Sequence, residues 1–264
     1  MSTTTTVVVT ALSPSLEDAF KDVELVALDI EGVDLGRNGQ ISLIQLSPSP
    51  AKCFLLDLLG HDKDSALVGW LRSLLESKSV LKIIHDCRMD SDALKYRLAI
   101  DLAHCHDTSC WHLHIHREPD ANLNTVLRAN GIKQNIERDS SVYAANHAFW
   151  ATRPLTPRMI QWAAGDVCSL FHVHAKQTTA PSHHQVAAEA LSETYLNLAR
   201  SASTATLCVL NVGAFIGRGG ANIRDLQKRT NTLLYPRGPR GVKCFLVYYH
   251  TEAALAAVKR SASV

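Results

Sequence analysis

The sequence has no regular arrangement of cysteines, no signal-peptide pattern in residues 1–15 and no long apolar run. Its seven cysteines are an odd number with no CxxC pair, which favours reduced thiols in an intracellular compartment. Residues 1–15 hold no Lys or Arg ahead of an apolar stretch, so we expect no secretory signal. No apolar run reaches about 18 residues, which predicts that nothing spans a membrane. We therefore expect a cytoplasmic or nuclear protein without a membrane partner.

Charge is divided unevenly along the 264 residues. Hydrophobic residues make up 46% and charged residues 20%, a composition typical of a globular protein with room for one large and one small domain. Residues 201–264 carry nine Lys and Arg against two acidic residues, a net charge of +7, which leaves −5 for residues 1–200. A basic tail behind an acidic body fits a phosphate-binding module behind a carboxylate site for metal; chance clustering of surface charge is the alternative.

Hydrophobic periodicity predicts a mixed α/β domain. Three apolar or alternating segments joined by short turns suggest an antiparallel meander, and alternating helices and strands follow. We expect strands at 24–31, 40–47, 52–57 and 80–84, and helices at 67–75, 91–98, 123–130, 157–174 and 185–200. This order implies an α/β sandwich around a mixed sheet.

Two carboxylates stand two residues apart on the first of these strands. Asp29 and Glu31 therefore point to the same face of the sheet. If they are buried, they repel each other unless a cation joins them, and oxygen ligands suit magnesium or manganese. The alternative is a strand end at which both acids meet solvent.

Three ordered motifs carry a resemblance to a known family. They are Leu28-Asp-Ile-Glu-Gly32 with Gly39-x-Ile-Ser-Leu-Ile-Gln-Leu46, then Lys82-Ile-Ile-His-Asp-Cys-Arg-Met-Asp90 with Asp107-Thr108, and Arg153-Pro-Leu-Thr-Pro-Arg-Met-Ile-Gln-Trp-Ala-Ala-Gly-Asp-Val167. Over about residues 20–176 the chain resembles the DEDD 3′–5′ exonucleases, in the branch of ribonuclease D and Egalitarian-like proteins. The resemblance implies a ribonuclease H-like fold.

The resemblance also implies a two-metal site for phosphodiester hydrolysis. Its ligands would be Asp29, Glu31, Asp90 and Asp166. Two Mg²⁺ or Mn²⁺ ions about 3.5–4 Å apart would activate a water and stabilise the leaving oxygen. Asp86 and Asp92 compete for the role of Asp90, which the spacing from His85 favours.

Trp162 departs from the family pattern. In the Tyr branch, a tyrosine four residues before the last aspartate orients the attacking water, and that position here is Trp162. Because residues i and i+4 share a helix face, Trp162 lies beside Asp166. Its indole N–H donates one hydrogen bond and accepts none. His85 or Tyr143 could replace the tyrosine; otherwise Trp162 is a core aromatic and the site is degenerate.

The basic tail holds a second motif, the GxxG loop Gly217-Arg-Gly-Gly220. We expect strands at 207–211, 232–235 and 242–249, and helices at 212–216, 221–230 and 252–261. This order resembles a eukaryotic, type I KH domain, a small α+β fold that clamps about four nucleotides of single-stranded RNA. The implied binding residues are the loop residues Gly217, Arg218, Gly219 and Gly220, with Ile216, Ile223 and Arg224.

A histidine-rich stretch, residues 104–116, is a weaker candidate site. Zinc would require four ligands that converge tetrahedrally. No CxxC pair occurs here and Asp107-Thr108 belongs to the second motif, so we expect surface or core histidines rather than zinc ligands.

The sequence thus predicts four segments and one leading function. The segments are a flexible N-terminus (1–19), an exonuclease domain (20–176), a helical extension or linker (177–203) and a KH domain (204–264). The leading function is a metal-dependent 3′–5′ exoribonuclease whose KH domain binds the single-stranded substrate. A non-catalytic RNA-binding adaptor is the competing hypothesis, and an exonuclease that takes single-stranded DNA is a third.

Overall fold

The computed structural model describes residues 4–139, 141–237 and 244–262. The chain divides into two compact units. The first comprises residues 1–140 and 148–197, and the second residues 141–147 and 198–264.

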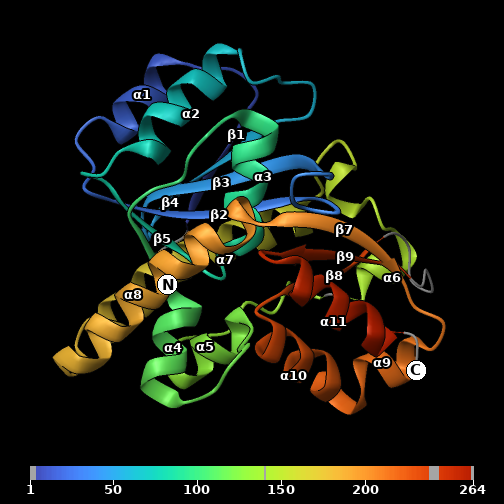
Figure 1. Cartoon of the computed structure of the whole chain (residues 1–264). Helices are drawn as coiled ribbons and strands as arrows, with labels where there is room; N and C mark the ends of the chain where they lie inside the picture. Colours follow the sequence, from blue (N-terminus) through green and yellow to red (C-terminus); the bar gives the residue numbers. More distant parts are fainter. Residues whose placement is uncertain (1–3, 140, 238–243, 263–264) are drawn as a thin grey trace. The chain divides into compact units, whose positions relative to one another are not determined.

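The first unit is built on a six-stranded mixed sheet with the order β1-β4-β3-β2-β5-β6 (Figure 1). β2, β3 and β4 form the expected antiparallel meander, while β1 pairs with β4, β5 with β2, and β6 with β5 in parallel. The strands are β1 (Thr5–Val9), β2 (Leu25–Val33), β3 (Gln40–Ser49), β4 (Lys52–Asp57), β5 (Leu81–Ile84) and β6 (Cys105–Asp107). The predicted mixed sheet is confirmed.

Helices cover both faces of this sheet (Figure 1). The side chains of α1, α2 and α3 form one apolar core with alternate residues of β2, β3 and β4, while α7 packs on the other face across β2 to β5. The helices of this unit are α1 (Pro14–Phe20), α2 (Ala66–Glu76), α3 (Arg88–Leu98), α4 (Thr108–His116), α5 (Leu123–Ala129), η1 (Phe149–Ala151), α7 (Pro157–Gln177) and α8 (Ser182–Ser201, which continues past the end of the unit).

The alternation of β2 sorts its side chains between these two layers. Val26, Leu28 and Ile30 belong to the core beneath α1 to α3. Asp29 and Glu31 point the other way, toward α7. α7 begins sharply because the Thr156 hydroxyl accepts a hydrogen bond of 3.3 Å from the Met159 amide and a proline occupies its first turn. The local sequence therefore sets the first residue of α7, the helix that carries Asp166 opposite Asp29 and Glu31.

The second unit is an antiparallel three-stranded sheet with the order β7-β9-β8 and helices packed on it. Its elements run α6 (Val142–Ala145), β7 (Ser203–Cys208), α9 (Val212–Ile216), η2 (Arg218–Gly220), α10 (Ala221–Thr230), β8 (Leu233–Arg237), β9 (Cys244–Tyr249) and α11 (Glu252–Ala262). From β7 onward the order is strand, two helices, two strands, helix. The core consists of side chains such as Phe215, Phe245 and Val247.

Two predicted segments are corrected by the structure. The expected flexible N-terminus contains β1, which pairs with β4 from Thr5↔Lys52 to Val9↔Leu56, and α1, whose Leu16 and Phe20 are buried. The strand expected at 207–211 is β7, which begins at Ser203 because residues 203–208 pair with β9. The predicted boundary between residues 203 and 204 therefore falls within the first two residues of β7, and Asn211 caps α9 instead of ending a strand.

Residues 177–203 consist mostly of α8, which packs on the first unit. Leu196 is buried in the core of that unit, and its carbonyl accepts a 2.7 Å hydrogen bond from the Ser91 hydroxyl. The sequence predicts that this segment is either a helical extension of the large domain or a linker. Its residues up to Asn197 belong to the first unit and so form an extension of that domain. The sequence did not predict the short β6 or the adjoining α4.

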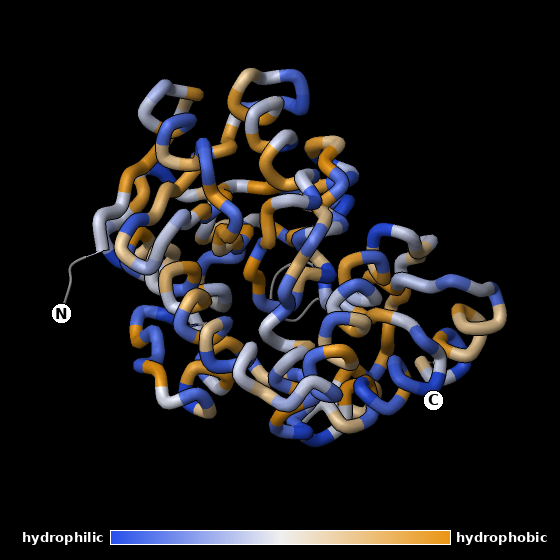
Figure 2. The backbone as a smooth tube through the Cα atoms, turned by 90° about the vertical axis from the view of Figure 1, so that its left-hand side faces the viewer, coloured by the Kyte–Doolittle hydropathy of each residue, from blue (hydrophilic) through white to orange (hydrophobic). Residues whose placement is uncertain are grey.

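The hydropathy of the trace alternates between apolar and hydrophilic stretches along the chain (Figure 2). Among the described residues, no helix combines the length and apolar character that crossing a bilayer requires.

Candidate functional site

Three carboxylates converge where β2 faces α7. Ligand oxygens of Asp29, Glu31 and Asp166 all lie within 4.8 Å of one another. A register shift between Glu31 and Gly32 in the β2–β3 pairing places a bulge directly beside them, a feature that re-aims side chains next to functional sites. In the described part of the chain, this is the cluster whose spacing could hold a metal ion.

Burial and mutual repulsion dominate the electrostatics of this cluster. Burial, followed by the charge of Asp166, raises the pKa of Asp29 to about 7. Burial also raises the pKa of Glu31, and the charges of Asp29 and Asp166 add to this shift. Burial raises the pKa of Asp166 despite its hydrogen-bond donors. Such a cluster stores unfavourable energy that a bound cation relieves.

Asp90 lies on α3, and its side chain is buried. Its pKa is raised first by burial and next by the charge of Asp29, so the two acids influence each other electrostatically. Asp90 is not part of the tight group of three.

The two competing aspartates of the second motif have arginine partners. Asp86 forms an ion pair of 2.6 Å with Arg88. The buried Asp92 accepts hydrogen bonds from the backbone amide and guanidinium of Arg37, at 2.7 to 3.0 Å. Both acids are thus neutralised locally, which leaves Asp90 as the acid of this motif available to the cluster.

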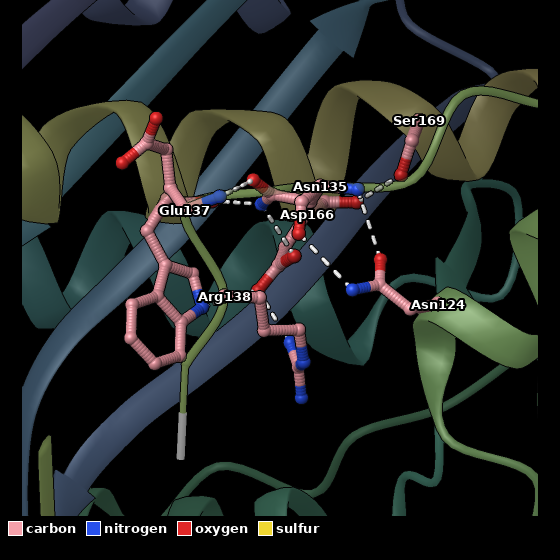
Figure 3. A network of polar contacts seen from close by, with 7 residues as sticks. Asn124, Asn135, Glu137, Arg138, Asp166 and Ser169 are labelled. Atoms are coloured by element: carbon pink, nitrogen blue, oxygen red, sulfur yellow. Dashed lines mark hydrogen bonds and ion pairs between the residues drawn. The ribbon is translucent and has the colours of Figure 1, made fainter. Parts of the chain in front are cut away.

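Asp166 is surrounded by three donors (Figure 3). Its Oδ1 accepts from the Asn135 amide at 2.8 Å. Its Oδ2 accepts both from Arg138 Nη1, at 2.5 Å, and from the indole Nε1 of Trp162, at 2.9 Å. Arg138 also attracts Asp29 and Glu31 electrostatically, and the three acids together raise its pKa. A guanidinium therefore supplies positive charge where the family resemblance places metal.

Sequence reasoning missed Asn135 and Arg138. Both lie in the irregular segment between α5 and α6, where no periodicity marks them. Asn135 is positioned by Asn124, with which it exchanges two hydrogen bonds of 2.9 and 3.0 Å. It approaches α7 at Gly165, where a Cβ would lie 2.8 Å from its amide nitrogen. The glycine in the third motif is the one sequence signal of this close approach.

Trp162 is 2% exposed and belongs to an aromatic cluster. Its ring packs edge-on against Trp150, with centroids 5.4 Å apart, and lies tilted against the ring of Phe149 at 5.9 Å. Of the suggested substitutes for the missing tyrosine, His85 is hydrogen-bonded through Nδ1 to the Thr108 hydroxyl at 2.9 Å. Tyr143 lies in α6, which groups with the second unit.

The three carboxylates can hold a divalent cation, but the Arg138 guanidinium on Asp166 opposes its binding. Asp29, Glu31 and Asp166 offer oxygen ligands at suitable separations. Asn135 and Trp162 are neutral donors, and a carboxylate has lone pairs for them and for a metal ion. Arg138 carries a charge of the same sign as the ion, so its contact with Asp166 opposes metal binding.

The GxxG loop of the second unit has an unusual backbone. Gly217, Gly219 and Gly220 have φ of 74°, 59° and 81°, values that favour glycine. A Cβ at Gly217 would lie 2.6 Å from the Asn222 side chain, whose amide donates a 2.8 Å hydrogen bond to the Ala214 carbonyl. Of these glycines, Gly219 is the one at which a Cβ would meet nothing within 4 Å, so the loop joins α9 to α10 with its backbone open at that residue.

The other predicted binding residues of this unit flank the loop. Ile216 and Ile223 are partly buried against its core. Arg218 opens η2, and Arg224 lies in the first turns of α10. Two other basic residues of the tail, Arg240 and Lys243, lie outside the described residues.

The histidine-rich stretch forms other contacts. His106 stacks on Trp111, with centroids 4.3 Å apart, and its Nε2 is 2.9 Å from the Gln177 amide oxygen. His112 lies 3.2 Å from the Glu118 carboxylate. None of these histidines joins a metal-like group among the residues that the structure describes.

Comparison with known proteins settles the family. Residues 9–179 match the 3′–5′ exonuclease domain family. The chain belongs to this family. The match begins within β1 and ends just past α7, so it contains all four carboxylates and Trp162.

Relatives of this exonuclease chain include proteins named for RNA. It is 28% identical over 157 residues to piRNA biogenesis protein EXD1 of Homo sapiens, and the match spans 54% of this chain but 30% of that protein. A Trypanosoma brucei RNase D complex with RNA U12 is 25% identical, with a TM-score of 0.63, over 75% of this chain and 71% of that one. Brucella melitensis NrnC bound to pGG shares the fold, with a TM-score of 0.62 at 20% identity over 74% and 91% of the two chains.

Proposed function

We propose that this exonuclease-family chain hydrolyses single-stranded RNA from its 3′ end and depends on Mg²⁺ or Mn²⁺. The observation that carries the proposal is the convergence of Asp29, Glu31 and Asp166 within 4.8 Å. A bound pair of ions would supply the activated water and the charge that stabilises the leaving oxygen. Asp90, whose pKa is raised by burial and by the charge of Asp29, would serve the second ion through water.

RNA is the favoured substrate class on two grounds. The RNase D relative was solved with RNA U12, and the EXD1 relatives are named for piRNA biogenesis. A single-stranded DNA substrate is the weaker candidate.

We further propose that residues 204–264 act as a type I KH domain that grips the substrate strand. The order of elements from β7 to α11 and the three positive-φ glycines of the loop support it. The backbone N–H groups at the start of α10 would contact phosphate, with charge added by Arg218 and Arg224. Tethering this module to the nuclease raises the local concentration of the strand.

A non-catalytic RNA-binding adaptor is the second candidate function. It is favoured by Trp162 at the tyrosine position and by Arg138 on Asp166. Both side chains donate hydrogen bonds to the Asp166 carboxylate, which therefore has partners without a metal ion. In an adaptor, the exonuclease fold would serve as a platform and the KH domain would supply RNA affinity.

One experiment separates these functions. Single-stranded RNA is incubated with Mn²⁺ and either the wild type or a variant with Asp29→Asn and Glu31→Gln, and both cleavage and RNA affinity are measured. The proposal predicts cleavage that the variant loses while its RNA affinity persists. No cleavage by the wild type, together with salt-sensitive RNA binding, would support the adaptor.

A further inference from the structure

We infer that Arg138 is a built-in counter-ion that competes with divalent metal for the three-carboxylate cluster and must leave Asp166 before the ion binds. The inference deepens the proposed function and rests on its metal site. It concerns metal occupancy, which is measurable whether or not RNA is cut.

The charge balance of the cluster supports the competition. Asp29, Glu31 and Asp166 all attract Arg138, so the guanidinium offsets part of their repulsion. Arginine does not lose its proton at accessible pH. It must therefore move away to reduce the positive charge beside an incoming ion.

The hydrogen-bond geometry shows which donor has to move. Asn135 and Trp162 hold Asp166 through neutral N–H groups, which are compatible with a carboxylate that also binds metal. Arg138 shares Oδ2 with Trp162. Among the three side chains that donate to Asp166, Arg138 is the cation. It is therefore the donor that a bound metal ion would repel.

The position of Arg138 in the chain allows it to withdraw. Its side chain is 33% exposed, against 1% for Asp166. It lies outside any helix or strand, between α5 and α6. A long side chain at such a site can rotate into solvent without repacking the core.

Manganese titration of variants tests the competition directly. Calorimetry is used to compare Mn²⁺ binding by the wild type, Arg138→Gln and the control Arg128→Gln, which removes an exposed arginine of α5. We expect Arg138→Gln to bind Mn²⁺ roughly tenfold more tightly or better, the ratio that corresponds to one charge-assisted hydrogen bond. The control should match the wild type. Equal or weaker binding by a folded Arg138→Gln would overturn the inference.

Removal of the counter-ion should also appear in stability. Without metal, Arg138→Gln should melt below the wild type because the carboxylates lose a counter-charge. Mn²⁺ should raise its melting temperature by more than it raises that of the wild type. Equal metal-induced shifts in the two proteins would contradict the competition.

A labelling experiment on the wild type covers the case in which Arg138→Gln fails to fold. Phenylglyoxal modifies accessible guanidinium groups, and mass spectrometry quantifies each site. Mn²⁺ should increase modification of Arg138 while leaving Arg128 unchanged. Unchanged or reduced labelling of Arg138 at saturating Mn²⁺ would overturn the inference, as would an absence of Mn²⁺ binding.

The outcomes separate this inference from the proposed function. Tighter Mn²⁺ binding by Arg138→Gln without RNA cleavage by either protein would contradict the exonuclease activity alone. RNA cleavage with equal Mn²⁺ affinities would contradict the competition alone.

Discussion

The indole N–H of Trp162 donates a 2.9 Å hydrogen bond to Oδ2 of Asp166, one turn further along α7. A tryptophan at this position therefore contacts the carboxylate itself. Its N–H cannot accept a proton or a hydrogen bond from a nucleophilic water. At the position where the Tyr branch has a residue that orients water, this chain has a hydrogen-bond donor to Asp166, the proposed metal ligand.

Trp162→Tyr should raise the rate of RNA cleavage if the metal site is otherwise competent. The gain should be on the order of 10²-fold, the lower end of what a positioned hydroxyl contributes to proton transfer. The loss of ring volume should cost less stability than the about 3–5 kcal/mol of Trp→Ala. Trp162→Phe, which lacks the hydroxyl, is the control. If single-turnover rates of the two variants are equal, the hydroxyl plays no part.

Gly165→Ala should lower the stability of the wild type because the added methyl group would collide with the Asn135 side chain. A Cβ at residue 165 would lie 2.8 Å from the Asn135 amide nitrogen, so the asparagine would have to shift from Asp166. In an Asn135→Ala background the same substitution should stabilise the fold by about 1 kcal/mol through helix propensity. Thermal melts of the four proteins measure the coupling. An identical effect in both backgrounds would refute the close approach.

Mn²⁺ affinity should rise with pH through neutrality. Burial and Asp166 raise the pKa of Asp29 to about 7, so at acidic pH this ligand holds a proton that metal must displace. Affinity measured by calorimetry should increase from about pH 5 to about pH 8 and then level off. Asp29→Asn should weaken Mn²⁺ binding and reduce this dependence, and the remainder should come from Glu31, whose pKa burial also raises. An affinity that stays constant across the window would contradict the raised pKa.

Replacing Arg218 and Gly219 by Asp should weaken RNA binding strongly. The change puts negative charge into the loop, and Asp tolerates the positive φ of 59° at residue 219. Fluorescence anisotropy with single-stranded RNA should show at least a roughly tenfold loss, with a smaller salt dependence. Arg260→Asp, which reverses an exposed charge on α11, should have less effect. An unchanged affinity of the loop variant for single-stranded RNA would contradict the proposed KH domain.

The sequence predicts which carboxylates share a face of β2 and which residues are neighbours on α7 because these signals are periodic. Asp29 and Glu31 share a strand face, and Trp162 and Asp166 share a helix face, so spacing alone indicates their neighbours. The convergence of β2 on α7 follows from the family motifs. The predicted metal and RNA roles of these residues remain predictions.

Other features depend on tertiary contacts that no local pattern encodes. Arg138 and Asn135 lie in an irregular segment, and the close approach of Asn135 to α7 depends on Gly165. β1 has a threonine-rich sequence without clear alternation and is held by its parallel pairing with β4. β6 has three residues, too few for a periodic signal.

The direction and the metal dependence of RNA cleavage provide the sharpest test of the proposed 3′–5′ exoribonuclease activity. Single-stranded RNA labelled at its 3′ end and, separately, at its 5′ end is incubated with Mn²⁺ and the wild type or Asp166→Ala. We predict immediate release of a labelled mononucleotide from the first substrate and a ladder of shortening fragments from the second. Both should be absent in the variant and in EDTA. Intact RNA with the wild type, or equal cleavage by Asp166→Ala, would contradict the account.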